Sequence, residues 1–449
     1  MSYQNGIINH LIENEIEISF PDNDEATITQ ANIVSESMTL KQSICDSAEL
    51  RFGGCIASEF NIKLMNTPER QFSSQLVGKW ISVKITQHYS DPDELIYPSG
   101  SLYPSDSLYP GYTLGSQSFY IFSGFIDSAP VDKTDKNIFN IVAYDVMAKL
   151  YEVDATNYLY SFFKNSSGTF SLDRLFTEVL SSANNTVSDI GTTGTAVIRN
   201  EIYYNGSVNA MVSSFTPSNE YWMTQKDKIS FGMLLKGICE IFGVFGVIEP
   251  NSGKGSFTFK RLKGTAETYA FYEELETEEY LSTGYTDFRF AVSGASRDGK
   301  SVLHGGLSAA DDDAIDKVYD FSDNILILQP YASSGQGRTS TPFDFLVNNS
   351  DIGARLAMNP AAEGHTGQCA FSTYQPLSAS LDARLWVTVG SPIEILVSKT
   401  DVSGNYIDNN GNIITDGTIV KESVKTYVLS RTITGIQAMT DKIEVKGVR

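Results

Sequence analysis

The chain of 449 residues exceeds what one hydrophobic core usually serves, so its length favours two to four domains. It carries 33 Lys and Arg against 54 Asp and Glu, a net charge of -21. This charge argues against tight binding of nucleic acid or anionic lipid, because both need clustered basic side chains. An apolar fraction of 41%, with 25 Phe and 23 Tyr and no apolar run long enough to cross a membrane, predicts a folded, soluble protein.

Half-buried antiparallel strands are expected to build the first region. The segments Ile16–Phe20, Phe60–Leu64 and Trp80–Ile85 alternate apolar and polar side chains, which is the period-two pattern of such strands. The same pattern predicts two further strands, at Phe119–Ile126 and Ile138–Val142.

A proline-rich repeat interrupts this strand pattern at about residues 91–117. Ile96-Tyr-Pro, Leu102-Tyr-Pro and Leu108-Tyr-Pro follow one another with a six-residue period, and their prolines exclude a central strand. One interpretation is a long hairpin loop held together by its own tyrosines. The other is a contact arm that grips a neighbouring subunit. A short helix at Tyr144–Leu150 is expected to close the region, which we place at residues 1–148.

The next region, at 149–275, is predicted to be an α+β lobe. Ser171–Leu180 and Ser230–Phe242 carry apolar side chains on one helical face, which is typical of amphipathic helices. A hairpin with strands at 244–248 and 256–261 follows.

The β pattern returns in the last region, which we place at 276–449. Its predicted strands lie at Phe288–Val292, Ile325–Leu328, Ile393–Val397 and Tyr427–Arg431. The sequence therefore predicts a mainly β protein with an α+β insert.

One stretch fits a catalytic motif, because Gly294–Ser301 matches the G-x-x-x-x-G-K-[ST] phosphate loop. Such a loop must open a helix, whereas two glycines stand soon after this match. A hairpin turn with Gly299 and Lys300 at its tip is the favoured interpretation. The sequence contains no G-x-S-x-G, H-E-x-x-H or G-x-G-x-x-G motif in a suitable context.

Other residues with metal-binding or redox chemistry give no clear site. The acidic run at 310–316 lacks the glycine and distal glutamate of a calcium loop, and His304 stands in loop-like sequence. A zinc site at His365 and Cys369 lacks a second pair of ligands, and a Cys45–Cys55 bridge is the alternative to reduced thiols. We therefore predict no catalytic residue, no cofactor and no metal ligand, hence no enzyme.

The amino terminus shows no secretory signal. Met1–His10 lacks both a basic start and an apolar stretch, so folding in a cytoplasm is expected.

Three separated passages resemble the tail and baseplate hub proteins of bacterial viruses, in the version common among prophages of Gram-positive bacteria. The first passage comprises Ile33–Leu40 with Ser43–Cys45 and Leu50–Phe60. The second passage comprises Gly124–Asp127 and Ala143–Leu150, with Leu234–Cys239 leading into Phe245–Val247. The third passage comprises Val389–Ile393 and Tyr427–Asp441. Together they span most of the chain.

The resemblance implies two β-barrel-like hub domains joined by an α/β lobe, as in tail-tip proteins and in the base of type VI secretion spikes. Three copies would form a homotrimeric ring that connects the six-fold tail tube to a three-fold spike or central fibre and lines part of the DNA channel. Implied partners are further copies of the chain, a distal tail or tail tube protein, a tape measure protein and a spike or central fibre protein. DNA is in contact only in transit, during ejection and host cell entry.

The resemblance places the protein at the virion tail tip or baseplate, after assembly in the host cytoplasm. Since longer relatives continue into a wall-cutting or fibrous region, this chain is expected to be the hub alone. Two other functions stay open: a carbohydrate-binding β protein on the virion exterior, and a tail-associated peptidoglycan hydrolase. The resemblance holds equally for contractile and non-contractile tails, and for viruses and tail-derived bacteriocins.

Overall fold

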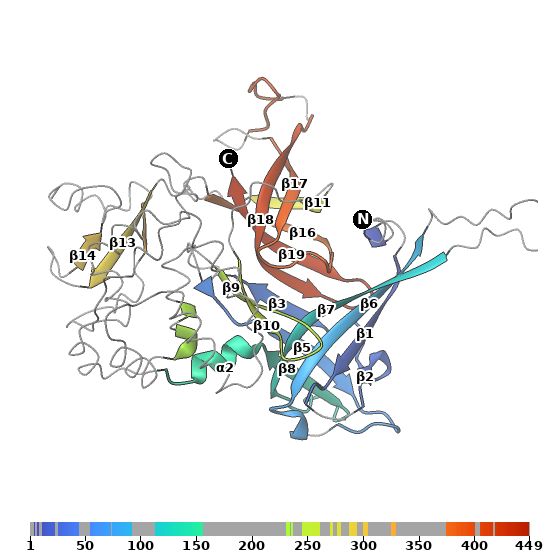
Figure 1. Ribbon diagram of the computed structural model, residues 1–449. Coiled ribbons are helices and arrows are strands. Elements are labelled where there is room, and N and C mark those ends of the chain that lie inside the picture. Colours follow the sequence, from blue (N-terminus) through green and yellow to red (C-terminus); the bar gives the residue numbers. More distant parts are fainter. Residues whose placement is uncertain are drawn as a thin grey trace, which may run out of the picture.

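The computed structural model is mainly β, as predicted, with one large sheet and two small ones (Figure 1). Within the described residues, no helix is both long and apolar enough to cross a membrane. The structure describes residues 4, 7–8, 11–22, 26–44, 54–72, 74–91, 113–155, 230–233, 235–236, 245–260, 270–272, 276–279, 287–293, 300–303, 325–328, 374–399, 405–415 and 418–448.

The amino-terminal part of the large sheet contains the strands predicted from alternation. In β5 every second side chain, from Phe60 to Leu64, is buried, because successive residues of a strand point to opposite faces. The elements are β1 (Leu11–Ser19), β2 (Ile28–Thr29), η1 (Gln30–Asn32), β3 (Thr39–Ser43), β5 (Glu59–Met65), η2 (Ser74–Leu76), β6 (Trp80–Asp91), β7 (Thr113–Ser128) and β8 (Ile138–Tyr144).

The carboxy-terminal part of this sheet is also largely antiparallel. Strand β18 pairs with β17 on one stretch and with β19 and β3 on another, whereas β11 joins β17 in parallel. Its strands are β11 (Ala270–Tyr272), β12 (Glu276–Glu279), β16 (Tyr374–Asp382), β17 (Pro392–Ser398), β18 (Lys421–Thr434) and β19 (Thr440–Val448).

The two parts meet edge to edge. Strand β18 pairs antiparallel with β3, from Ser430 opposite Ser43 to Thr434 opposite Thr39. The main path of the sheet is β12-β16-β19-β18-β3-β5-β8-β7-β6-β1-β2. In Figure 1 the carboxy-terminal strands, in red and orange, continue into the blue and teal amino-terminal strands. Among the described strands this sheet is open at both ends, so the two expected barrels are not formed by these pairings.

Two three-stranded sheets lie outside this large sheet. One joins β4 (Gly54–Cys55) in parallel to β9 (Phe245–Glu249), which forms the predicted hairpin with β10 (Ser256–Lys260). The other joins β13 (Asp287–Ser293) to β14 (Lys300–Leu303) and β15 (Ile325–Leu328).

One apolar core serves both ends of the chain. Phe60 and Phe122 stack at its centre, with ring centroids 5.1 Å apart, and both side chains are almost completely buried. Leu385, Ile433 and Met439 from the carboxy-terminal part belong to the same cluster of buried residues. Packing against shared side chains therefore holds the two parts together in addition to the β3–β18 pairing.

Two element boundaries differ from those predicted. The helix α2 runs from Val146 to Glu152 instead of starting at Tyr144, because the side chain of Asp145 caps its amino terminus. Residues 113–117 belong to β7 and not to the loop, since they continue the ladder with β6 as far as Thr113 opposite Asp91. The rest of the Tyr-Pro loop, at 92–112, and the helix expected at 171–180 lie outside the described residues.

Candidate functional site

Residues of the three passages meet at two places, together with Asn14, Gln87 and Tyr151 from outside the passages. We call these places the helix joint and the turn joint. The helix joint consists of Cys55, Ser58, Asp145, Met147 and Tyr151, at the start of α2. The turn joint consists of Asn14, Glu36 and Gln87 around the turn 435–438 between β18 and β19. Both joints connect segments far apart in the sequence.

Asp145 is the centre of the helix joint. Its Oδ1 accepts the backbone N–H of Met147 at 2.9 Å, which caps α2, and its Oδ2 accepts the backbone N–H of Ser58 at 2.7 Å. The residue is only 2% exposed, and burial raises the pKa of its carboxyl to about 7 although both backbone bonds act in the opposite direction. One carboxyl group thus fixes the direction of α2 relative to β5.

Two glycines permit close packing at the helix joint. A Cβ on Gly124 of β7 would lie 2.1 Å from the backbone oxygen of Tyr144, so only glycine fits there. A Cβ on Gly246 of β9 would lie 2.9 Å from Sγ of Cys55, and Tyr151 donates its hydroxyl to the Cys55 carbonyl at 2.6 Å. Gly124, Tyr144 and Gly246 of the second passage therefore bring β7, β8 and β9 close together at the helix joint.

Glu36 forms the outer half of the turn joint. It adopts a left-handed backbone conformation, φ 53°, which is uncommon outside glycine. Its Oε2 accepts the backbone N–H of Ile436 at 2.8 Å and its Oε1 accepts that of Gln437 at 3.0 Å. These bonds, the Ile436 bond above all, lower the pKa of the Glu36 carboxyl. Glu36 of the first passage thus binds the turn 435–438, which belongs to the third passage.

Asn14 and Gln87 form the buried half of the turn joint, and each is 1% exposed. Nδ2 of Asn14 donates to the backbone oxygens of Ile436, at 2.9 Å, and Gln437, at 3.2 Å. Oδ1 of Asn14 accepts a hydrogen bond of 3.0 Å from Nε2 of Gln87. A chain of amides therefore runs from β6 through β1 to the turn.

A buried ion pair stands next to this joint. Arg431 of β18 contacts Asp441 of β19, and their side chains are 2% and 1% exposed. The guanidinium also donates to the backbone oxygen of Val387. An unpaired buried charge is strongly unfavourable, so removing either Arg431 or Asp441 alone would destabilise the fold.

The hairpin of β9 and β10 docks on the large sheet through its turn. Ser123 Oγ donates to the backbone oxygen of Asn251 at 2.8 Å and accepts the Asn251 N–H at 2.9 Å. Lys254 pairs with Asp22 at 3.1 Å, and its ammonium lies 5.1 Å from the ring centroid of Trp80. This hairpin is thereby fastened to β6 and β7.

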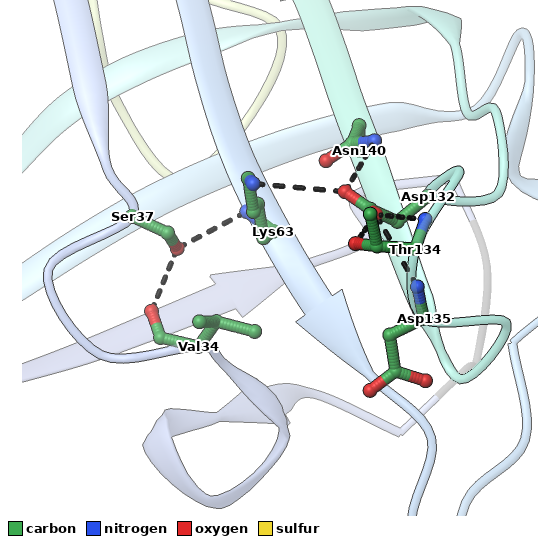
Figure 2. Close-up of polar contacts among 7 residues, drawn as sticks. All are labelled: Val34, Ser37, Lys63, Asp132, Thr134, Asp135 and Asn140. Atoms are coloured by element: carbon green, nitrogen blue, oxygen red, sulfur yellow. Dashed lines mark hydrogen bonds and ion pairs between the residues drawn. The ribbon is translucent and has the colours of Figure 1, made fainter.

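Figure 2 shows a polar cluster at the turn between β7 and β8. Asp132 accepts hydrogen bonds from Thr134 Oγ1 at 2.6 Å, from Thr134 N at 2.9 Å and from Asn140 Nδ2 at 3.3 Å. The Thr134 bonds are the main reason that the pKa of the Asp132 carboxyl is lowered. Lys63 approaches it to 3.7 Å. These contacts fix a turn, as Asx turns do.

The structure favours the hairpin interpretation of the phosphate-loop match. Lys300 and Ser301 begin β14, which pairs antiparallel with β13, and Lys300 lies opposite Ser293. The helix that a phosphate loop requires is therefore replaced by a strand, and Lys300 is the first residue of that strand and not part of the tip of the turn. Cys55 is buried and its Sγ lies 3.1 Å from Sδ of Met147, whereas Cys45, its partner in the alternative bridge, lies outside the described residues. His304, His365, Cys369 and the run 310–316 lie outside the described residues.

Sequence reasoning missed the buried polar residues of the turn joint and of the ion pair. A signal was present, because each stands at the inward phase of an alternating strand. Asn14 precedes Ile16 and Ile18, and Gln87 follows Val83 and Ile85 with the same period of two. Arg431 and Asp441 occupy the same phase in β18 and β19. A polar residue in such a position predicts a buried partner.

Comparisons with known proteins give likenesses among solved structures. No protein-family model matches the chain, and no curated protein matches it. The structure is similar to a tail protein from Neisseria meningitidis MC58, with 8% identity, 97% of each chain covered and a TM-score of 0.45. It is similar to the 43 kDa tail protein of prophage MuSo2 from Shewanella oneidensis, with 10% identity, 97% and 98% of the two chains covered and a TM-score of 0.43. It is also similar to the E. coli c3393 protein, a component of the type VI secretion system, with 6% identity, 96% and 77% covered and a TM-score of 0.36.

Proposed function

We propose that this chain is the structural hub of a phage or phage-like tail tip or baseplate. The observation that carries the proposal is the turn joint, in which Glu36 of the first passage holds Ile436 and Gln437 of the third. Two of the three passages that resemble hub proteins therefore help to join the two ends of the chain. A protein that transmits load between a tube and a spike needs such joints more than it needs a catalytic cleft.

In this proposal the chain acts as a homotrimer on the tail axis. Regions 1–148 and 276–449 each contribute one barrel-like domain, around the lobe 149–275, so that three chains present six domains to the six-fold tube. The tube or distal tail protein and the tape measure protein lie on one side, and the spike or central fibre protein lies on the other.

The acidity of the chain suits a DNA channel. Three chains at -21 each carry a formal charge of -63, and carboxylates along a lumen repel phosphate and let DNA pass without binding. The proposed location is the virion tail tip, after assembly in the host cytoplasm, and the proposed role in ejection and host entry is structural and not enzymatic.

Labelling the chain in purified particles and imaging the tail tip tests this proposal. The expected result is three copies on the tail axis at the junction of tube and spike. A single copy per particle, or six copies with one barrel each, would contradict it. Clearing of cell walls in a zymogram would instead favour the hydrolase, and binding of host glycans by the isolated chain would favour the carbohydrate-binding protein.

A further inference from the structure

A cavity lies beside the turn joint, where the two ends of the chain meet. Its volume is about 280 Å³, just below the range of roughly 300–1,000 Å³ typical of small-molecule sites, so it suits a single large side chain. Its walls are largely apolar, with Ile8, Leu11, Trp386 and Met439 among them. Two of these lining side chains are partly exposed, Ile8 at 47% and Leu11 at 41%.

One buried acceptor in the cavity wall has no donor among the described residues. Asn14 Nδ2 donates to two backbone carbonyls, which can only accept, so the orientation of the Asn14 amide is fixed. Asn14 Oδ1 must then accept from Nε2 of Gln87, and this fixes the Gln87 amide as well. Gln87 Oε1 is left buried, and no group in the described part of the chain donates to it. The hydrogen bonds of Asn14 therefore determine which end of the Gln87 amide is the oxygen.

These two features define the side chain that would fill the cavity. It has an apolar or aromatic body to pack against Leu11, Trp386 and Met439, and it carries one hydrogen-bond donor for Gln87 Oε1. Tyrosine combines a large ring with a phenolic O–H donor, and it is ordered at low entropic cost. A neutral donor also suits a site whose acceptor is an amide and not a carboxylate.

The chain itself offers three such tyrosines. Tyr97, Tyr103 and Tyr109 each stand between an aliphatic residue and a proline in the repeat within 92–112. This segment connects β6 to β7, and Gln87 is in β6 only four residues before Asp91, the last residue of that strand. At about 3.3 Å per residue, β6 therefore ends roughly 13 Å beyond Gln87, and the segment follows directly.

The two strands that flank the segment pair with each other up to its two ends. Strands β6 and β7 stay paired up to Asp91 and Thr113, beyond the end of β1, whose last partner is Tyr89. The ring of Tyr89 lies on Gly115, where a Cβ would come within 2.4 Å of it. Strands β6 and β7 thus extend two residues past the start of β1, and the segment connects their ends.

We propose that a tyrosine of the 96–111 repeat of a neighbouring copy inserts into this cavity and donates its hydroxyl to Gln87 Oε1. The exchange would fasten each subunit of the ring to the next. The arrangement of the copies in a ring rests on the proposed function. The cavity and its acceptor do not, because both belong to the single chain.

Peptide binding tests the cavity without requiring a tail. The receptor is the full chain with Tyr97, Tyr103 and Tyr109 replaced by serine, and the probe is a synthetic peptide of residues 101–111. Because the peptide lacks tryptophan, the fluorescence of Trp386 reports binding, and W386F provides the control for signals from Trp80 and Trp222. Saturable binding is expected, weakened about 10-fold when both peptide tyrosines become phenylalanine and roughly 100-fold when they become serine.

A matched peptide with Ser105 and Ser107 replaced by alanine should bind unchanged. In the receptor, Q87E should weaken binding less than Q87L, because glutamate keeps an acceptor at this position. No saturable binding, or equal binding of the tyrosine and serine peptides, would overturn the inference. The copy number in particles is measured separately, so that failure here leaves the proposed hub standing.

Cross-linking tests the exchange between copies. Chains carrying L11C are mixed with chains carrying S105C under oxidising conditions, and each variant alone serves as the control. A covalent dimer found only in the mixture is expected. No covalent dimer in the mixture, or an equal yield of dimer with either variant alone, would overturn the exchange. Deleting residues 96–111 should in addition impair tail assembly while the monomer stays folded.

Discussion

Asp145 and Glu36 each accept two backbone N–H hydrogen bonds at a joint between distant segments, yet their carboxyl pKa values shift in opposite directions. Asp145 is 2% exposed, and loss of solvation raises its pKa to about 7. Glu36 is exposed and keeps most of its solvation, so its hydrogen bonds from backbone N–H groups lower its pKa. The comparison teaches that burial, and not the number of hydrogen bonds, decides the sign of the shift.

Truncation of Asp145 should give the largest effect. D145A removes the helix cap and leaves the Ser58 and Met147 N–H groups buried without an acceptor, which should lower the free energy of unfolding by about 2–4 kcal/mol. Urea denaturation of the full chain measures this loss. D145N keeps one acceptor and should lose less. If both variants were as stable as the original chain, the helix joint would not depend on this group.

The pH dependence of Asp145 sharpens the comparison. Because its folded pKa of about 7 lies above its ordinary value of 3.8, the folded state keeps a proton that the unfolded state releases. Stability from this group therefore falls as pH rises from about 4 to 7 and is constant above that. The measurement is the difference in unfolding free energy between the original chain and D145N at each pH. A difference that does not change over this window would contradict the raised pKa.

Glu36 should show a smaller effect of opposite sign. Since its folded pKa lies below the ordinary 4.5, its contribution is present above that pH and is lost as pH falls further. At neutral pH, E36A should cost about 1 kcal/mol through the two lost turn bonds, and E36Q should cost less because it keeps one acceptor. E36G is the control for the φ of 53°, since glycine relieves that strain while losing the same bonds.

Lys63 should give the smallest effect. It approaches Asp132 to 3.7 Å with a side chain that is 47% exposed, whereas Thr134 and Asn140 already satisfy this carboxylate. K63Q should therefore leave the thermal midpoint within measurement error, as is usual for surface ion pairs. T134V, which removes a 2.6 Å bond from the same turn, is the matched comparison and should lower the midpoint further.

The sequence predicted local structure well, because alternation is a property of neighbouring residues. It located β5, β9 and β10 and placed a short helix after β8, although the cap by Asp145 shifted that helix by two residues. The pairing of β3 with β18 was not predicted, since both strands have ordinary β patterns and nothing in either one names its partner. The two joints were likewise missed as sites, although the passages that form them were singled out, because burial of Asn14 and Asp145 depends on segments far along the chain.

The β3–β18 pairing also has a consequence for synthesis of the protein on the ribosome. At about 5–20 residues per second, roughly 20–80 s pass between the emergence of β3 and that of β18. During this time one edge of β3 has its backbone N–H and C=O groups unpaired while its other edge is already covered by β5. The nascent chain therefore exposes an unpaired strand edge, which can pair with other chains, until β18 has been synthesised. High local concentrations of unfinished chains, as on a polysome, are the condition under which that edge would pair with the wrong strand.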